Sequence, residues 1–339
     1  MKIFITGGAG FIGSNAADYF LKQGNDVIVY DNLSRKGGLF NLEWLRGRHG
    51  EGLTFYQADI RDYDDLAGRI QGTDVVLHLA GQVAVTTSVS DPREDFEINA
   101  LGTFNVLEAV RHHCPQAAVL YASTNKVYGG LEGVRISETD SRHTYTDFVN
   151  GIPENMPLDF HSPYGCSKGA GDQYTIDYAR IYGLRSVSLR QSSIYGPRQF
   201  GIEDQGWVAH FIIAACLNRS IAIYGDGKQV RDILYISDLI RAYQLAIERI
   251  DEVKGQALNL GGGPENTLTI WSEFGPMLES MLGRTIPVEY ADWRPGDQRV
   301  FFANVNRARQ LLGWQPLVSP ADGIAKLLDW VSTNRQLFE

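Results

Sequence analysis

A tyrosine and a lysine four residues apart are the first candidate reactive pair in the sequence. Tyr164 and Lys168 follow Pro163 at the start of a predicted helix, where residues at this spacing share one face. A cation beside a phenol favours the phenolate, so we expect Lys168 to lower the pKa of Tyr164. Thr124 closes a preceding predicted strand, and its hydroxyl could hydrogen-bond the same substrate oxygen. These three residues predict proton transfer at a substrate hydroxyl group.

The spacing alone does not specify this chemistry. Tyr224 and Lys228 are also four residues apart, but they span Gly225–Gly227, which predicts a turn and not a helix face. The alternative for Tyr164 and Lys168 is a pair on the surface of a helix. Their place at the start of a helix, together with a cofactor motif elsewhere in the chain, favours the catalytic interpretation.

Three glycines near the start of the sequence predict a dinucleotide site. Gly7, Gly10 and Gly13 follow a short β-branched run and precede a helical segment. Glycine permits the tight turn and lets the backbone approach a pyrophosphate, which the helix N-terminus then faces with free N–H groups. Asp31 ends the next strand, 18 residues after Gly13 (31 − 13), close to the ~20 expected for a carboxylate that holds a ribose diol. The alternative is a purely structural glycine turn.

The residue at the end of that second strand also indicates which cofactor binds. The carboxylate of Asp31 would repel a 2′-phosphate, so the sequence favours NAD over NADP. Arg35 and Lys36 lie nearby and could soften this preference, or they could be solvated charges. Asp59 and Ile60 follow the third strand, where they could meet the adenine.

The elements that carry these residues alternate between strand and helix. Strand signals lie at 2–6, 26–30, 53–57, 75–79, 119–122 and 186–191, and the helical stretches between them at 11–23, 62–70, 95–112 and 164–182. This alternation predicts the α/β class, with a Rossmann-type, doubly wound parallel sheet that is covered on both faces.

The character of the sequence changes after Tyr195. The run Gly196–Gly201 is rich in glycine and proline and predicts a loop, and a mixture of short elements follows it. We expect an NAD-binding Rossmann domain of residues 1–195 plus about 231–260. A smaller mixed α/β lobe, formed by about 196–230 plus 261–339, would bind the substrate. The polar segment 137–159 predicts a surface insertion or lid.

Composition excludes several classes of protein. The 339 residues carry a net charge of −9, from 40 acidic and 31 basic side chains, which argues against coating of nucleic acid. The apolar runs are far shorter than the ~20 residues that cross a bilayer, and no secretory pattern precedes the first strand. Three cysteines without a C-x-x-C pair favour a reducing cytoplasm. His112 and His113 are adjacent and point to different sides of a helix, so we expect no metal site.

As a set, these motifs resemble the extended short-chain dehydrogenase/reductase superfamily. The resemblance spans essentially the whole chain and includes the glycine motif, Asp31, the run 78–81, Tyr164–Lys168 and Tyr195–Arg198. It implies a nucleotide-sugar substrate and a tightly bound NAD that is regenerated in every turnover. The residues implied to bind the cofactor are Gly7, Gly10, Phe11, Ile12, Gly13, Asp31, Asn32, Ser34, Arg35, Asp59, Ile60, Leu79, Ala80, Gly81, Gln82, Asn99, Ser123, Tyr164, Lys168 and Gln191.

Within the superfamily, the chain resembles the CDP-paratose 2-epimerases, also called CDP-tyvelose 2-epimerases. The distinctive stretches are GQVAVTTS at 81–88, STNKVYG at 123–129, HSPYGCSK at 161–168, RQSSIYG at 190–196 and GKQVRD at 227–232. The resemblance implies an isomerase that inverts C2 of a CDP-sugar through a transient keto intermediate. It also implies a role in supplying a dideoxyhexose for a surface polysaccharide such as the O-antigen of lipopolysaccharide.

Departures from related enzymes narrow the chemistry. Sugar-nucleotide 4,6-dehydratases carry an aspartate and a glutamate where this chain has Asn125 and Lys126, so the acid and base for eliminating water are missing. UDP-galactose 4-epimerases usually carry an asparagine where this chain has Ser193, which disfavours a UDP-sugar 4-epimerase without removing it. A non-catalytic NAD sensor is a third interpretation, which the presence of Tyr164 and Lys168 disfavours.

The resemblance also suggests which residues hold the substrate. Arg231 and Arg294 match phosphate-contacting positions of related epimerases, and a guanidinium pairs well with phosphate oxygens, although both could form surface salt bridges instead. Gln191 could line the sugar pocket or be a satisfied polar group in the core. The other candidates are Ser88, Thr124, Asn125, Ser192, Ser193, Gln205 and Trp207. Helices 95–112 and 164–182 form the dimer interface in related proteins, so we expect a homodimer or homotetramer.

Overall fold

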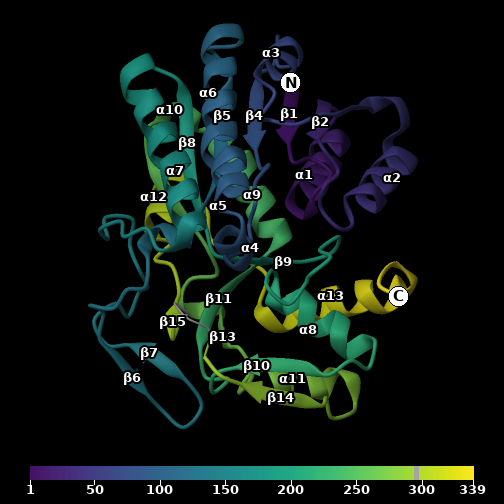
Figure 1. The fold of residues 1–339 in the computed structure, drawn as a ribbon, viewed down its shortest axis with the longest axis vertical. Coiled ribbons are helices and arrows are strands. Elements are labelled where there is room, and N and C mark those ends of the chain that lie inside the picture. The colour runs from purple at the N-terminus through teal and green to yellow at the C-terminus, as the bar shows by residue number, and fades with distance from the viewer. Residues whose placement is uncertain (294–297) are drawn as a thin grey trace.

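A parallel sheet of seven strands organises the molecule (Figure 1). The computed structural model describes residues 1–293 and 298–339. The strand order is β12-β8-β5-β4-β1-β2-β3, so the chain reverses its direction of travel between β1 and β4, which is where doubly wound folds bind ligands. The strands are β1 (Lys2–Thr6), β2 (Asp26–Asp31), β3 (Leu53–Gln57), β4 (Val75–His78), β5 (Ala118–Thr124), β8 (Arg185–Gln191) and β12 (Ala257–Leu260). The predicted α/β class and Rossmann-type sheet are confirmed.

Helices cover both faces of this sheet because its strands are apolar on both sides. Ile3 and Ile5 of β1 belong to the core beneath α1 (Phe11–Lys22), α2 (Gly38–His49) and α9 (Ile236–Glu248). Phe4, between them, points to the opposite core, beneath α3 (Tyr63–Arg69), α6 (Gly102–His113) and α7 (Ser162–Tyr182). Successive side chains of a strand point to opposite faces, so one apolar run serves both cores.

The predicted helix over 95–112 is divided in the structure. Asp91 caps the short helix α5 (Pro92–Phe96) by accepting a hydrogen bond from the Glu94 backbone at 3.0 Å. A π-helical turn at Glu97–Leu101 then leads into α6, and a further short helix, α4 (Val85–Ser90), precedes α5. Such turns recur at functional sites, and this one carries the buried side chain of Asn99.

Smaller sheets form the second part of the molecule, below the large sheet in Figure 1. β11 (Val230–Tyr235) pairs with β9 (Ser193–Tyr195), β13 (Thr267–Thr269) and β15 (Val300–Phe301), and β10 (Ile221–Tyr224) pairs with β14 (Val288–Ala291). The remaining helices are α8 (Trp207–Cys216), α10 (Ile250–Val253), α11 (Phe274–Leu282), α12 (Asn306–Leu312) and α13 (Pro320–Thr333).

We keep the division into two lobes as a proposal. Sheet membership supports part of it, because β12 pairs with β8 in the large sheet. β9 and β11, which the proposed division places in the NAD-binding domain, instead pair with each other outside that sheet, and β11 also pairs with β13 and β15. β9 and β11 therefore connect the two proposed lobes.

The polar segment 137–159 contains more regular structure than its sequence indicates. β6 (Ile136–Glu138) and β7 (His143–Tyr145) form a hairpin at the lower left of Figure 1. His143 and Tyr145 are buried, and the Tyr145 hydroxyl donates to the carbonyl of Val300 at 2.7 Å. The segment thus packs on β15 through alternate residues of one strand, a pattern too short to recognise among polar neighbours.

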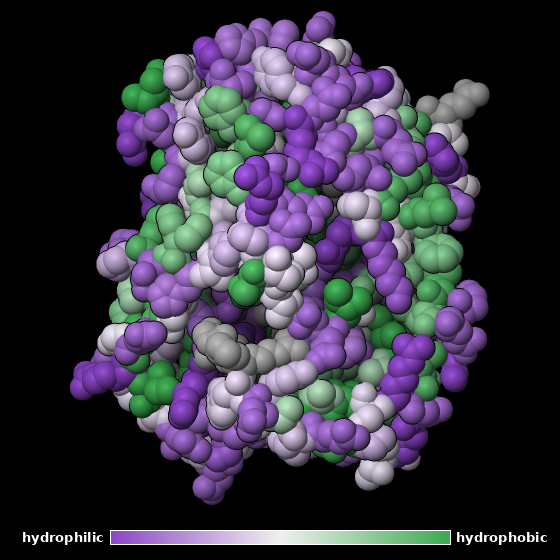
Figure 2. All heavy atoms as spheres, viewed as in Figure 1, coloured by the Kyte–Doolittle hydropathy of each residue, from purple (hydrophilic) through white to green (hydrophobic). Residues whose placement is uncertain are grey.

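Hydrophilic residues cover most of the face shown in Figure 2, which is hollowed between the large-sheet part and the smaller sheets. Among residues 1–293 and 298–339, no helix combines the length and apolar character needed to span a membrane.

Candidate active site

The glycine loop after β1 leaves no room for side chains. Gly7 has a φ of +68°, and a Cβ built on it would lie 2.7 Å from the Ala80 nitrogen. A Cβ on Gly13 would lie 2.2 Å from the Gly7 carbonyl oxygen. The loop therefore packs directly on the segment after β4 and on the first turn of α1. Only glycine permits this approach, and it leaves backbone N–H groups at the helix start for an anion.

The carboxylate of Asp31 is fixed at the end of β2 by backbone groups. It accepts hydrogen bonds from the Ala9 nitrogen at 3.0 Å and from the Leu33 nitrogen at 2.8 Å. Burial raises the pKa of Asp31 above its ordinary value, and these hydrogen bonds oppose that shift. Asp31 thus ties the glycine loop to the end of β2, beside the cavity where a ribose would lie.

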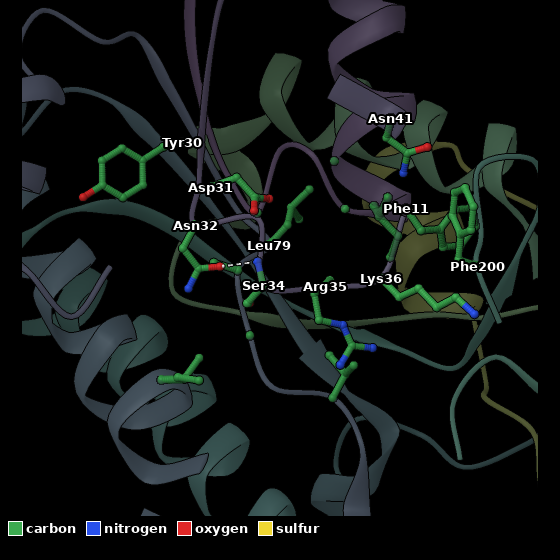
Figure 3. Close-up of a pocket in the computed structure, with 18 of the residues that line it drawn as sticks. Phe11, Tyr30, Asp31, Asn32, Ser34, Arg35, Lys36, Asn41, Leu79 and Phe200 are labelled. Carbon is green, nitrogen blue, oxygen red and sulfur yellow. Dashed lines mark hydrogen bonds between the residues drawn. The ribbon is translucent and has the colours of Figure 1, made fainter. Parts of the chain in front are cut away.

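Asn32 and Asp59 form the neighbouring wall. The Asn32 amide donates to the Asp59 carboxylate at 2.9 Å and accepts from the Ser34 nitrogen at 3.0 Å, as Figure 3 shows for the second contact. Arg61 binds Asp59 through two nitrogens, at 2.7 and 3.0 Å, and lowers the pKa of that carboxyl to about 2. These residues therefore stay polar and ordered at the edge of the cavity.

The glycine loop, Asp31, Asn32 and Asp59 line a cavity of about 1110 Å³, a volume that includes open solvent. Of the predicted cofactor residues, those lining it are Gly7, Gly10, Phe11, Ile12, Gly13, Asp31, Asn32, Ser34, Arg35, Asp59, Ile60, Leu79, Ala80 and Gly81. The closed glycine cradle, the ordered carboxylate and the small residues of the facing wall fit a bound dinucleotide.

Sequence reasoning missed part of this lining. Arg198, Gln199, Phe200 and Gly201 also face the cavity, from the loop after β9. The stretch Tyr195–Arg198 stood out in the sequence, but nothing in its residues indicated that a loop about 190 residues after the glycine motif lines the same cavity.

Other predicted cofactor residues lie behind the cavity wall. The Asn99 amide donates to the Gln82 carbonyl at 2.9 Å, and its oxygen accepts from the Gln82 nitrogen at 2.9 Å. A Cβ on Gly81 would lie 3.0 Å from this Asn99 oxygen and 3.8 Å from Lys168 Nζ. The absence of a side chain at Gly81 therefore brings Lys168 against the wall of the cavity.

Tyr164 is buried at the start of α7 and hydrogen-bonds with Thr124. Burial raises the pKa of Tyr164 to about 12, and the hydrogen bond with Thr124 opposes the shift. This differs from the expected lowering by Lys168. The physical reason is that desolvation of the phenolate, together with the negative charge of Asp95, outweighs the hydrogen bond with Thr124, so the protein groups alone favour the neutral phenol.

Lys168 lies one helical turn further along the same buried face. Its ammonium donates to the Ala122 carbonyl at 2.6 Å and lies 4.3 Å from the centroid of the Tyr121 ring. Burial lowers the pKa of Lys168 to about 7, while the carboxylates of Asp172 and Asp95 oppose the shift. The lysine is therefore poised to gain or lose a proton near neutral pH.

A buried ion pair supports the strand ends beside this pair. Asp172 accepts from Arg190 at 2.9 and 3.0 Å, from Ser123 Oγ at 2.7 Å and from Ser188 Oγ at 2.6 Å. Ser123 thus binds the carboxylate of Asp172, and its neighbour Thr124 is left facing Tyr164. Because both charges are fully paired, this network fixes the end of β5.

The predicted substrate residues are more scattered. Gln191 donates to the Tyr243 hydroxyl at 2.7 Å, and the Ser88 hydroxyl donates to the Val85 carbonyl at 2.7 Å, so both have partners in the core. Asn125 is half-buried next to Thr124, and Gln205 lines the cofactor cavity. Ser192 follows β8 and Ser193 begins β9, and both are half-buried. Trp207 is half-buried and packs against Phe211 and Phe274, whereas Arg231 is buried in β11. Arg294 lies outside the described residues.

Among the described residues, a cluster of possible metal ligands lies outside this site, and no motif in the sequence indicated it. Glu138, His143 and Asp226 place one ligand atom each within 4.8 Å of the others. Lys228 binds Glu138 at 2.8 Å, and His143 Nε2 lies 3.0 Å from Asp226. Ion pairing between the hairpin and the turn after β10 accounts for the cluster.

Comparison with known proteins identifies the family. Residues 3–261 match the NAD-dependent epimerase/dehydratase family. The chain belongs to this family. A relative of the chain is the CDP-paratose 2-epimerase of Salmonella typhi, which is 46% identical over 98% of this chain and 100% of that protein. The UDP-glucose 4-epimerase of Mycolicibacterium smegmatis is 33% identical over 99% of this chain and 100% of its own.

Solved structures agree with this assignment to the epimerase/dehydratase family. A UDP-glucose 4-epimerase from Thermotoga maritima, solved with UDP-glucose, has a TM-score of 0.84 and 31% identity over 100% of both chains. A UDP-glucuronic acid 4-epimerase from Bacillus cereus, solved with UDP-glucuronic acid and NAD, has a TM-score of 0.84 and 29% identity over 98% of this chain and 99% of its own. The predicted superfamily, the isomerase class and NAD as cofactor are confirmed.

Proposed function

We propose that this enzyme inverts C2 of a CDP-sugar, converting CDP-paratose to CDP-tyvelose while NAD stays bound. The observation that carries the proposal is the position of Lys168 behind Gly81 in the wall of the cofactor cavity, one helical turn after Tyr164, which hydrogen-bonds with Thr124. The full-length similarity to a CDP-paratose 2-epimerase supports the choice of sugar and nucleotide.

The residues divide the work of the reaction. NAD, when bound, accepts a hydride from the sugar carbon and returns it, so the sugar shows no net oxidation. Tyr164 takes the proton of the sugar hydroxyl as the keto sugar forms and gives it back as that sugar is reduced. Thr124 donates a hydrogen bond to the same oxygen and holds it beside Tyr164. For C2 to invert, the keto sugar must present its other face before reduction.

Lys168 supports Tyr164 through charge and position. Its ammonium lies against the cavity wall next to Gly81, where it can also reach a ribose hydroxyl of the cofactor. A positive Lys168 favours the phenolate form of Tyr164, whereas burial favours the phenol. We infer that the phenolate forms only while Lys168 is protonated and the site is filled.

Substrate binding is assigned to the second lobe and the strand ends. We propose that Arg231 and Arg294 contact the diphosphate and that Gln205 and Trp207 begin the cover over the nucleotide. Asn125, Ser192 and Ser193 would line the sugar pocket, and Ser88 and Gln191 would shape it from behind. We further propose a cytoplasmic homodimer or homotetramer that supplies a dideoxyhexose for a surface polysaccharide.

Proton NMR of the purified enzyme with CDP-, UDP- and GDP-sugars, without added cofactor, tests the proposal. We expect inversion at C2 of CDP-paratose and no reaction of the UDP- and GDP-sugars. Inversion at C4 of a UDP-sugar would keep the roles of Tyr164 and Lys168 but overturn the substrate. Bound NAD without turnover of any sugar would support a sensor instead.

A further inference from the structure

A short stretch after β9 passes beside the cofactor cavity and contacts elements from both ends of the chain. Residues 197–201 are called the strap below, and four of them, Arg198 to Gly201, line the cavity. The strap begins on α1, where the Asn15 amide donates to the Pro197 carbonyl at 3.0 Å. The strap is therefore attached to α1, the helix that follows the glycine loop.

The backbone of the strap is held in an unusual conformation. Arg198 has a φ of +72°, in the left-handed region that residues other than glycine rarely adopt. Its carbonyl accepts from the Asn41 amide at 3.2 Å, and the same amide donates to the Ala9 carbonyl at 3.2 Å. Asn41 thus couples the strap to the glycine loop. Strained backbone that its surroundings hold in place is typical of ligand clamps.

The side chain of Arg198 is stacked against two tryptophans. Its guanidinium carbon lies 4.1 Å from the ring centroid of Trp44 and 5.6 Å from that of Trp330. Trp44 belongs to α2, beside the large sheet, and Trp330 belongs to α13, near the C-terminus. Burial lowers the pKa of Arg198 from its ordinary value, but the group remains a cation that the two aromatic faces attract. One side chain therefore joins the two parts of the molecule.

Phe200 anchors the other end of the strap. It stacks on Phe40 with ring centroids 5.9 Å apart and also packs on Phe338, with centroids 5.2 Å apart. A Cβ built on Gly37 would lie 2.1 Å from the Phe200 ring, so glycine at 37 makes room for this anchor. Figure 3 shows Phe200 and Asn41 on the side of the cavity away from Tyr30 and Asn32.

We propose that the strap retains NAD, and that the stacking of Arg198 between Trp44 and Trp330 sets how slowly the cofactor leaves. A ligand in the cavity lies between the glycine loop and the strap, so release requires the strap to lift. Lifting it separates Arg198 from both tryptophans and Phe200 from Phe40. An epimerase that returns its hydride in every turnover gains from such retention, because NAD never has to exchange. The inference concerns the cofactor alone and holds whichever sugar is converted.

The release rate of NAD from the purified holoenzyme tests this proposal without any sugar. The protein is desalted and diluted, and free NAD is measured over time by an enzymatic cycling assay. We expect Arg198→Met to release NAD about tenfold faster than the wild type, because it keeps the apolar stem and loses the cation. Arg48→Met is the matched control: Arg48 lies 5.9 Å from the Trp44 ring centroid but is paired with Asp18 and does not line the cavity. Its release rate should equal that of the wild type.

A second variant keeps the test decisive if Arg198→Met does not fold. Trp44→Leu removes the closer aromatic face and should release NAD faster by a similar factor. The double variant should release it no faster than the faster single variant, because both changes remove the same contact. Unchanged release in Arg198→Met, or in Trp44→Leu where only that variant folds, would overturn the proposal. Equally fast release from Arg48→Met would do so too, since general loss of positive charge would then explain the effect.

Discussion

The glycine loop and the tyrosine site lie on either side of one cavity wall, yet they are built by different means. The glycine loop and the carboxylate of Asp31 that holds it belong to a single stretch of chain, Lys2–Asp31, and the loop itself makes these contacts through backbone atoms. The tyrosine site draws Thr124 from β5 and Lys168 from α7, with Asp95 of α5 hydrogen-bonded to Ser167 beside them. Here side chains make the contacts, and buried hydrogen bonds hold them.

This difference predicts two kinds of failure. A substitution in the glycine loop acts through steric fit, so it should weaken NAD binding and stability together. A substitution of a reactive side chain in the tyrosine site should remove chemistry while the cofactor stays bound.

The largest effect is expected for Tyr164→Phe. Positioned general acids and bases typically contribute 10²–10⁴ to the rate, and phenylalanine keeps the ring but loses the proton-carrying group. We expect turnover of the NMR-identified sugar to fall by about a thousandfold. NAD retained after desalting, measured by absorbance, should match the wild type.

Thr124→Val is the companion variant for that measurement. It keeps the shape at residue 124 and removes the hydroxyl that hydrogen-bonds Tyr164, so turnover should fall less than in Tyr164→Phe. A rate for Tyr164→Phe within a factor of three of the wild type would remove Tyr164 from the chemistry.

The next effect is expected for Gly13→Ala. The added Cβ would meet the Gly7 carbonyl at 2.2 Å, so the loop or α1 must move. Overpacking of this kind costs about 1–3 kcal/mol of unfolding free energy. We expect the variant to unfold at lower urea concentration and to lose its NAD on desalting.

Gly47→Ala is the control for a glycine without such a contact. Gly47 lies on the exposed side of α2, and a Cβ there would meet no described atom within 4 Å. Alanine in a helix interior should stabilise the protein by about 0.5–1 kcal/mol and leave NAD in place. If Gly13→Ala holds NAD as firmly as Gly47→Ala does, steric fit is not what the loop contributes.

The same difference explains what could be predicted from the sequence. The glycine spacing and Asp31 identified the cofactor loop because all of its parts lie within one βαβ unit, and the alternation of strands and helices identified the fold. The hydrogen bonds of Gln191 to Tyr243 and of Ser123 to Asp172 join residues 52 and 49 positions apart, so neither could be predicted. The role of Arg198 was hidden for the same reason, since its two tryptophan partners lie near opposite ends of the chain.

Desolvation was the second effect that the sequence concealed. The pair Tyr164 and Lys168 suggested a lowered tyrosine pKa, but the sequence does not show how completely both groups are buried. In the structure burial dominates. It raises the pKa of Tyr164 to about 12 and lowers the pKa of Lys168 to about 7, so burial favours the neutral form of both groups.

His78 connects the two regions and gives the smallest expected effect, a pH dependence of stability. Thr6 Oγ1 accepts from the nitrogens of Leu79 and Ala80 and lies 2.8 Å from His78 Nδ1, so its hydroxyl proton is free to be donated to that nitrogen. His78 Nε2 lies 2.9 Å from Thr103 Oγ1, whose own proton goes to the Asn99 carbonyl, so Nε2–H is the donor there. These partners require the neutral imidazole, and burial lowers the pKa of His78 to about 3.

The sign of the effect follows from proton counting. The unfolded chain binds a proton at residue 78 below about pH 6.5, whereas the folded protein does not until about pH 3. This contribution to stability is therefore complete above pH 6.5 and is lost as the pH falls, by at most about 1.4 kcal/mol per pH unit. Urea unfolding at pH 7 and pH 5 should show His78→Gln losing about 2 kcal/mol less than the wild type between the two values. His113 is exposed, so His113→Gln should lose as much stability between pH 7 and pH 5 as the wild type does. If all three proteins lose the same stability, the acid sensitivity does not come from His78.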